Sequence, residues 1–242
     1  MNTKFLTTAA VLAFSLSTGA QASLVARAGG MVYDTINKIT WASDANLFKT
    51  QAAVNANLVS EIITANGGVI HDTPNYFDNG TYTLTTADFD ATTGAMTWWG
   101  AQAWANNLTL GGVTGWSLPS THVEAYGVNI TSSPMGDLFY NQLGGAAWTD
   151  IATTHNDNYN LFTNVQSYVY WSGSEYAPYP LNVWGFFTTN GYQTSDIGKD
   201  VQFYAWAVRP GDVAAVPVPG AFWLFGSGLV ALTGLKRRGS IG

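Results

Sequence analysis

The chain has 242 residues, no cysteine and a formal net charge of −6 at pH 7. All 15 acidic residues lie between positions 23 and 213, whereas four of the nine basic residues lie close to the two ends. An acidic region of this kind repels nucleic acid and anionic lipid, and the lack of cysteine excludes disulfides, thiol nucleophiles and zinc–thiolate sites. Between the two ends, about 190 residues remain, enough for one domain with a substantial core.

Residues 1–22 predict a signal peptide. Lys4 supplies a basic start, Phe5–Leu16 is short and mostly apolar, and Ala20 and Ala22 are the small residues of a signal-peptidase site. We therefore expect a mature chain that begins at Ser23 and is exported through the inner membrane. The alternative is an uncleaved anchor or a buried helix.

Residues 23–213 combine strand and helix patterns and are expected to form one domain. Strands are expected over 31–33, 39–41, 168–172, 182–189, 192–194 and 204–209, and the first two are expected to pair as a hairpin. Helices are expected over 47–65, 99–108 and after Ser133, and surface loops over 67–86 and 149–165. Asn190-Gly191 predicts a tight hairpin turn. This order indicates an α+β fold with an antiparallel sheet, short helices and long loops.

Aromatic residues suggest a sugar-binding surface near a proline-rich loop. Most tryptophans lie in expected strands and helices and are expected in the core. Tyr176, Tyr179 and Trp184 lie in or just after the loop, where exposed rings would stack on sugars. Glu175 begins the loop and would accept hydrogen bonds from sugar hydroxyls. The alternative is simple packing of these rings, with Glu175 capping its own loop.

A second polar segment suggests calcium binding. Asp150, Asn156, Asp157 and Asn158 supply the hard oxygen atoms that calcium prefers, although their spacing does not match an EF-hand. A polar surface loop without metal is the alternative. No other cofactor is expected.

Sequence signals for catalysis are lacking. The three histidines are far apart, and no Gly-x-Ser-x-Gly elbow, phosphate loop or dinucleotide fingerprint occurs. We expect no enzymatic activity, with a secreted hydrolase as a distant alternative.

The C-terminal segment 214–242 combines an apolar stretch with basic residues. Residues 221–235 carry no charge, and as a helix they would span about 22 Å, short of the roughly 30 Å hydrocarbon core. The cations that follow would stay in the cytoplasm. The residues that define this tail are Pro217, Pro219, Lys236, Arg237 and Arg238.

This tail resembles the PEP-CTERM sorting signal of Gram-negative bacteria, although Val218 stands where many members have glutamate. The resemblance implies a precursor held in the inner membrane. An exosortase-type enzyme would then cut near the Pro-x-Pro motif and release the protein to the cell surface or extracellular matrix. A plain C-terminal anchor is the alternative.

The region between the ends resembles the Lcl C-terminal-like domain, formerly a domain of unknown function. The resemblance rests on the segments VYDTINKITWASDAN, MTWWGAQAWANNL, GGVTGWSLPSTHVEAYG, YWSGSEYAP and YAWAVRPGDV, in this order. It implies a fold distantly similar to C-type lectins and formylglycine-generating enzymes, and binding to surface glycans without catalysis. Ser117 replaces the arginine usual in the Trp-Arg-Leu-Pro motif, which removes a cation suited to anionic ligands.

Together these observations predict an exported binding or structural protein that acts on the cell surface or in the matrix. Its expected partners are signal peptidase, an exosortase-type enzyme and an exopolysaccharide or other glycan, with no nucleic acid. A passive matrix component without a discrete ligand is the alternative.

Overall fold

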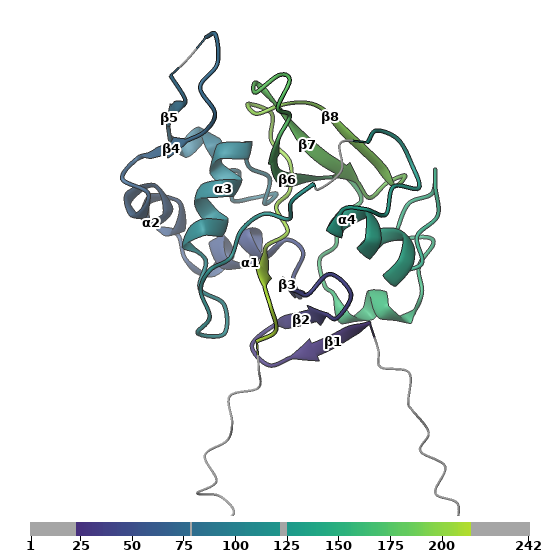
Figure 1. Ribbon diagram of the computed structural model, residues 1–242. Helices are drawn as coiled ribbons and strands as arrows, with labels where there is room; N and C mark the ends of the chain where they lie inside the picture. The colour runs from purple at the N-terminus through teal and green to yellow at the C-terminus, as the bar shows by residue number, and fades with distance from the viewer. Residues whose placement is uncertain (1–22, 78, 122–124, 214–242) are drawn as a thin grey trace, which may run out of the picture.

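The computed structural model describes residues 23–77, 79–121 and 125–213 (Figure 1). The expected signal peptide with Ala20 and Ala22, and the tail with Pro217, Pro219, Lys236, Arg237 and Arg238, lie outside these residues. Within the described residues, no helix has the length and apolar character needed to cross a bilayer. The expected apolar helix over 221–235 lies beyond them.

The first sheet joins the two ends of the described chain. Its strand order is β1 (Leu24–Arg27), β2 (Met31–Asp34), β3 (Ile39–Ala42) and β9 (Val208–Pro210), all antiparallel. The predicted β2–β3 hairpin is confirmed. Its turn forms because the Asp34 carboxyl accepts backbone hydrogen bonds from two turn residues, as Asp and Asn side chains commonly do.

Three helices share a hydrophobic core with Met31 and Ala42 of this sheet. They are α1 (Leu47–Val54), α2 (Leu58–Ala65) and α3 (Trp98–Asn107). The sequence predicts one helix over 47–65, but the chain breaks at Asn55, whose side chain accepts a hydrogen bond from the Asn57 backbone. Helix α3 matches its predicted range closely, and Thr97 caps it by accepting from the Gly100 backbone N–H at 3.2 Å.

A small hairpin occupies the segment expected to be a surface loop. Strands β4 (Val69–His71) and β5 (Thr81–Thr83) pair antiparallel, and the short 3₁₀ helix η1 (Thr86–Asp88) follows. The prediction of a surface loop over 67–86 is wrong at Val69–His71 and Thr81–Thr83, which form strands. Ile70 and Leu84 are buried against the core, and this anchors the hairpin. Figure 1 shows β4 and β5 beside α2 and α3.

The second half of the domain forms a three-stranded sheet with strand order β6 (Val169–Glu175), β7 (Asn182–Phe187) and β8 (Tyr192–Gly198). All neighbouring strands are antiparallel, and Gly191 makes the predicted turn with φ at 73°. Three short helical segments precede this sheet in the chain: α4 (Pro134–Asp137), η2 (Leu138–Gln142) and η3 (Asp157–Leu161).

Tryptophans dominate the core, and several donate their indole N–H groups to backbone carbonyls. Trp206 donates to Ala42 at 2.8 Å, and Trp171 donates to Met96 at 2.8 Å. Six tryptophans of the described residues are exposed by 2% or less: Trp41, Trp104, Trp116, Trp171, Trp184 and Trp206. The sheets and helices described above confirm the predicted mixture of antiparallel sheets and short helices. Large aromatic side chains provide the burial that stabilises this fold.

Candidate functional site

An aromatic groove lies where the β4–β5 loop meets the β6–β7 loop. It encloses about 280 Å³ and is lined by Pro74, Asn75, Tyr76, Phe77, Pro178, Tyr179, Pro180 and Leu181. Tyr76 is 95% exposed, Phe77 72% and Tyr179 60%. Large apolar rings gathered on one surface mark an interaction site more often than single exposed rings do.

Local hydrogen bonds fix the two loops that carry these rings. The Asn75 side chain accepts from the Phe77 backbone N–H at 2.8 Å, and this tight turn places the Tyr76 and Phe77 rings edge to face at 5.2 Å. In the opposite loop, Tyr179 donates its backbone N–H to Tyr176 at 2.7 Å. Prolines on both sides restrict the backbone further. The groove therefore presents aromatic rings on shaped loops.

A more polar hollow continues from the aromatic groove. It encloses about 340 Å³ and shares Asn75 and Leu181 with the groove. Asn182 and the exposed Asp200 bring amide and carboxyl groups to its wall. Such groups hydrogen-bond hydroxyls, so the two hollows together offer apolar and polar contacts side by side.

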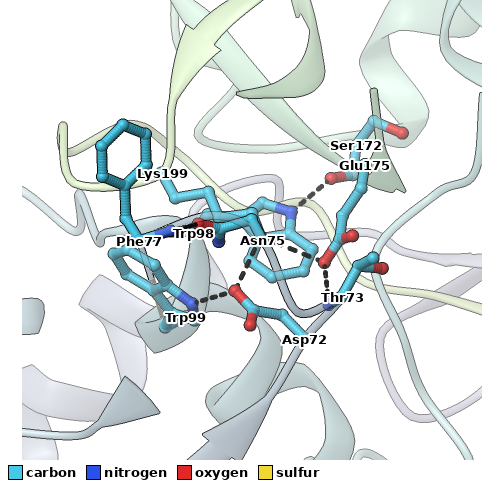
Figure 2. A network of polar contacts seen from close by, with 9 residues as sticks. All are labelled: Asp72, Thr73, Asn75, Phe77, Trp98, Trp99, Ser172, Glu175 and Lys199. Atoms are coloured by element: carbon cyan, nitrogen blue, oxygen red, sulfur yellow. Dashed lines mark hydrogen bonds and ion pairs between the residues drawn. The ribbon is translucent and has the colours of Figure 1, made fainter. Parts of the chain in front are cut away.

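A buried lysine cluster, formed by Lys199, Asp72 and Glu175, lies at the base of the polar hollow (Figure 2). Lys199 Nζ is 2.6 Å from Asp72 Oδ2 and 3.1 Å from Glu175 Oε1. The side chains of Lys199, Asp72 and Glu175 are exposed by only 2%, 3% and 15%. Removal of one partner from an ion pair this deeply buried is strongly destabilising, because it leaves a buried charge without compensation.

Two adjacent tryptophans at the start of α3 enclose the lysine cluster. Lys199 Nζ lies 4.9 Å from the ring centroid of Trp98 and 6.0 Å from that of Trp99, close enough for cation–π attraction. Trp99 donates its indole N–H to Asp72 Oδ2 at 2.9 Å, and the Thr73 backbone donates to Glu175 Oε1 at 3.1 Å. Figure 2 shows these contacts converging on the lysine.

The predicted sugar-binding residues separate into different environments. Tyr179 lines the aromatic groove, and Tyr176 is half-buried against Tyr126 and Trp184. Trp184 is 1% exposed, so the prediction that its ring stacks on a ligand is wrong. Glu175 turns inward to Lys199, and its contact with ligand hydroxyls stays a prediction.

Sequence reasoning missed Tyr76, Phe77 and Lys199. The first two lie in a segment read as a plain loop, although two adjacent aromatic residues flanked by proline and asparagine are an available signal. Lys199 gave no signal, because its partners are distant in the chain.

Three of the predicted calcium residues, Asp150, Asn156 and Asn158, make hydrogen bonds within the protein. Asp150 accepts hydrogen bonds from the Ala152 backbone and the Ser167 hydroxyl. Asn156 and Asn158 both donate their amide groups to the Gln142 carbonyl, at 3.0 and 2.9 Å. Across the described ranges, no group of three acidic, histidine or cysteine side chains is arranged to hold a metal ion. Calcium binding at Asp150, Asn156, Asp157 and Asn158 stays a prediction.

No protein-family model, curated protein sequence or solved structure matches the chain.

Proposed function

We propose that this protein is a non-catalytic binding protein whose ligand is a neutral polysaccharide held along the aromatic groove. The observation that carries the proposal is the exposure of Tyr76, Phe77 and Tyr179 on the β4–β5 and β6–β7 loops. The axial C–H faces of a pyranose ring pack on aromatic rings, while hydroxyls project sideways to polar groups. Asn182 and Asp200 stand beside the rings to receive those hydroxyls.

Charge supports a neutral ligand over a sulfated or phosphorylated one. The region from residue 23 to residue 213 contains all 15 acidic residues of the chain, and Lys199 is already paired with two carboxyl groups. An anionic polymer would meet net repulsion as it approached the groove. A neutral chain avoids this cost and keeps the stacking and hydrogen-bond contacts.

Binding to a panel of immobilised neutral and anionic polysaccharides tests the proposal. Each of Tyr76→Ala, Phe77→Ala and Tyr179→Ala is expected to weaken binding about tenfold, the equivalent of about 1.4 kcal/mol. Trp148→Ala is the matched control, because Trp148 is 68% exposed and is not among the residues that line the aromatic groove. A chelator arm reports whether calcium contributes.

Two results would contradict the proposal. One is the lack of saturable binding to any neutral polysaccharide, which would favour a passive matrix component. The other is binding that survives all three aromatic substitutions in a folded protein, which would place the ligand elsewhere.

Delivery to the cell surface or matrix is a second part of the proposal. The signal-peptide pattern at residues 1–22 and the sorting-tail pattern at residues 214–242 support it, as does the resemblance to the Lcl C-terminal-like domain with its lectin-like relatives. Signal peptidase and an exosortase-type enzyme are the processing partners. Mass spectrometry of the exported protein should find a chain that begins at Ser23 and ends near Pro217 and Pro219. A mature chain that still contains Arg238 would indicate a plain anchor.

A further inference from the structure

The lysine cluster contains the groups needed for an internal amide bond. Lys199 Nζ is 2.6 Å from Asp72 Oδ2, so the amine lies beside the carboxyl carbon to which it would be joined. Glu175 Oε1, 3.1 Å from the same nitrogen, is placed to take its protons. A nucleophile, an acyl group and a proton acceptor therefore meet in one buried place.

We propose that Lys199 and Asp72 condense to form an intramolecular isopeptide bond, with Glu175 as the catalytic proton relay. This inference does not depend on which ligand the aromatic groove takes. The reaction is a condensation between two side chains of the same chain, so it needs no oxidant, reductant or cofactor.

The atoms balance in two steps. Glu175 first passes one proton from the Lys199 ammonium to Oδ1 of Asp72, which leaves a neutral amine beside a neutral carboxylic acid. The Nζ lone pair then attacks Cγ, the C–N bond forms, and negative charge collects on Oδ2. When this intermediate collapses, the Cγ–Oδ1 bond breaks. Glu175 carries a second proton from Nζ to Oδ1, which leaves as water, and the amide keeps one N–H.

The surroundings favour this reaction. The Trp99 indole N–H already donates to Asp72 Oδ2 at 2.9 Å, and this is the oxygen on which charge develops. The Thr73 backbone N–H holds Glu175 Oε1 at 3.1 Å, which keeps the relay in position. Trp98 and Trp99 lie over the lysine and limit access of water, which would otherwise hydrate the ion pair and compete as a nucleophile.

The cross-link would join two segments that are far apart in the sequence. Lys199 and Asp72 are 127 residues apart in the chain. Asp72 directly follows β4 and precedes the loop that carries Tyr76 and Phe77, while Lys199 directly follows β8. A covalent link here closes a long loop and restricts the unfolded chain, as a disulfide does in proteins that contain cysteine. This chain has none.

Peptide mapping of the full chain tests the proposal. After denaturation, a protease that cleaves after glutamate cuts at Glu61, Glu124 and Glu175 and places Asp72 and Lys199 on different fragments. The expected product is one branched species whose mass is the sum of the two fragments less one water. Trypsin is expected to leave the bond after Lys199 uncut, because the modified side chain has lost its charge.

Variants separate the chemistry from the fold. Lys199→Arg, Asp72→Ala and Glu175→Gln are each expected to yield unlinked fragments of full mass. Glu175→Gln is the most specific test of proton transfer, because glutamine keeps the shape of the side chain and cannot relay protons. Lys49→Arg is the matched control, since Lys49 is exposed, and it should retain the link.

Two separate, full-mass fragments from the folded wild-type chain would overturn the proposal. A link that persists in Lys199→Arg would also overturn it, because arginine at this position offers no amine. Polysaccharide binding measured on the same samples reports on the aromatic groove, so failure of either proposal is seen independently of the other.

Discussion

The phenol ring of Tyr82 lies flat on the indole of Trp99, with ring centroids 3.7 Å apart and planes 1° from parallel. The stack joins β5 to the first turn of α3. Each ring then contacts a different carboxyl group: Tyr82 donates its hydroxyl to Asp88 at 2.8 Å, and Trp99 donates to Asp72 at 2.9 Å. The pair therefore connects the small hairpin to the lysine cluster. Through Asp88, which also accepts from the Thr97 hydroxyl, it connects the hairpin to the N-cap of α3.

Stability at high pH should depend on Tyr82. Desolvation, followed by the hydrogen bond to Asp88, raises the pKa of Tyr82 from 10.0 to about 12. Because the folded state favours the neutral phenol, its contribution is fully present below pH 10.0 and is lost as the pH rises toward about 12. Urea unfolding across this window should show a steeper loss of stability in the wild type than in Tyr82→Phe. Parallel curves for the two proteins would contradict this assignment.

Asp34 should be among the side chains most sensitive to substitution. It is completely buried and accepts hydrogen bonds from the backbone of Ile36 and from the amide groups of Asn37 and Gln142. Asp34→Ala removes the buried carboxylate that these donors share, and we expect a loss of about 3 kcal/mol or more in the free energy of unfolding.

Asp90 supplies the matched control for Asp34. It makes a similar turn by accepting from Thr92 and Thr93, but it lies nearer the surface. Asp90→Ala should cost only about 1 kcal/mol, because water replaces the lost acceptor. Chemical denaturation of both variants decides the matter, and equal losses would show that burial of Asp34 does not set its contribution.

Gly191 should not tolerate a side chain. Its φ of 73° is strained for other residues, and an added Cβ would overlap the Tyr140 hydroxyl. That hydroxyl also donates to the Gly191 carbonyl at 2.7 Å, so it cannot move away without losing the bond. Gly191→Ala should lower the melting temperature clearly more than Gly112→Ala, where φ is 78° but the space is open. Similar melting temperatures would mean that the backbone strain alone sets the cost.

Local signals in the sequence were sufficient for several elements. The β2–β3 hairpin, helix α3 and the β7–β8 turn were predicted because turn residues and caps lie within a few residues of the elements that they end. The β4–β5 hairpin was missed because its strands have three residues each, too few to show a period.

The candidate site was harder to predict for two physical reasons. Trp184 was expected at the surface, but β7 is buried at four consecutive positions, so alternation cannot indicate which side chains face outward. The lysine cluster joins residues from three distant segments, and only folding brings them together. The exposure of the Tyr76 and Phe77 rings was not predicted either, because it follows from the β4–β5 hairpin, which the sequence did not reveal.

The two ends of the described chain have a consequence for orientation. Arg27, at the end of β1, pairs with Asp212 at 2.7 Å, so both ends of the domain meet at one pole. In Figure 1 the β4–β5 loop rises at the opposite pole. A protein held at either end would thus point its aromatic rings away from the point of attachment. The distance between the attachment point and a bound ligand would then be set by the length of the domain, whichever end is attached.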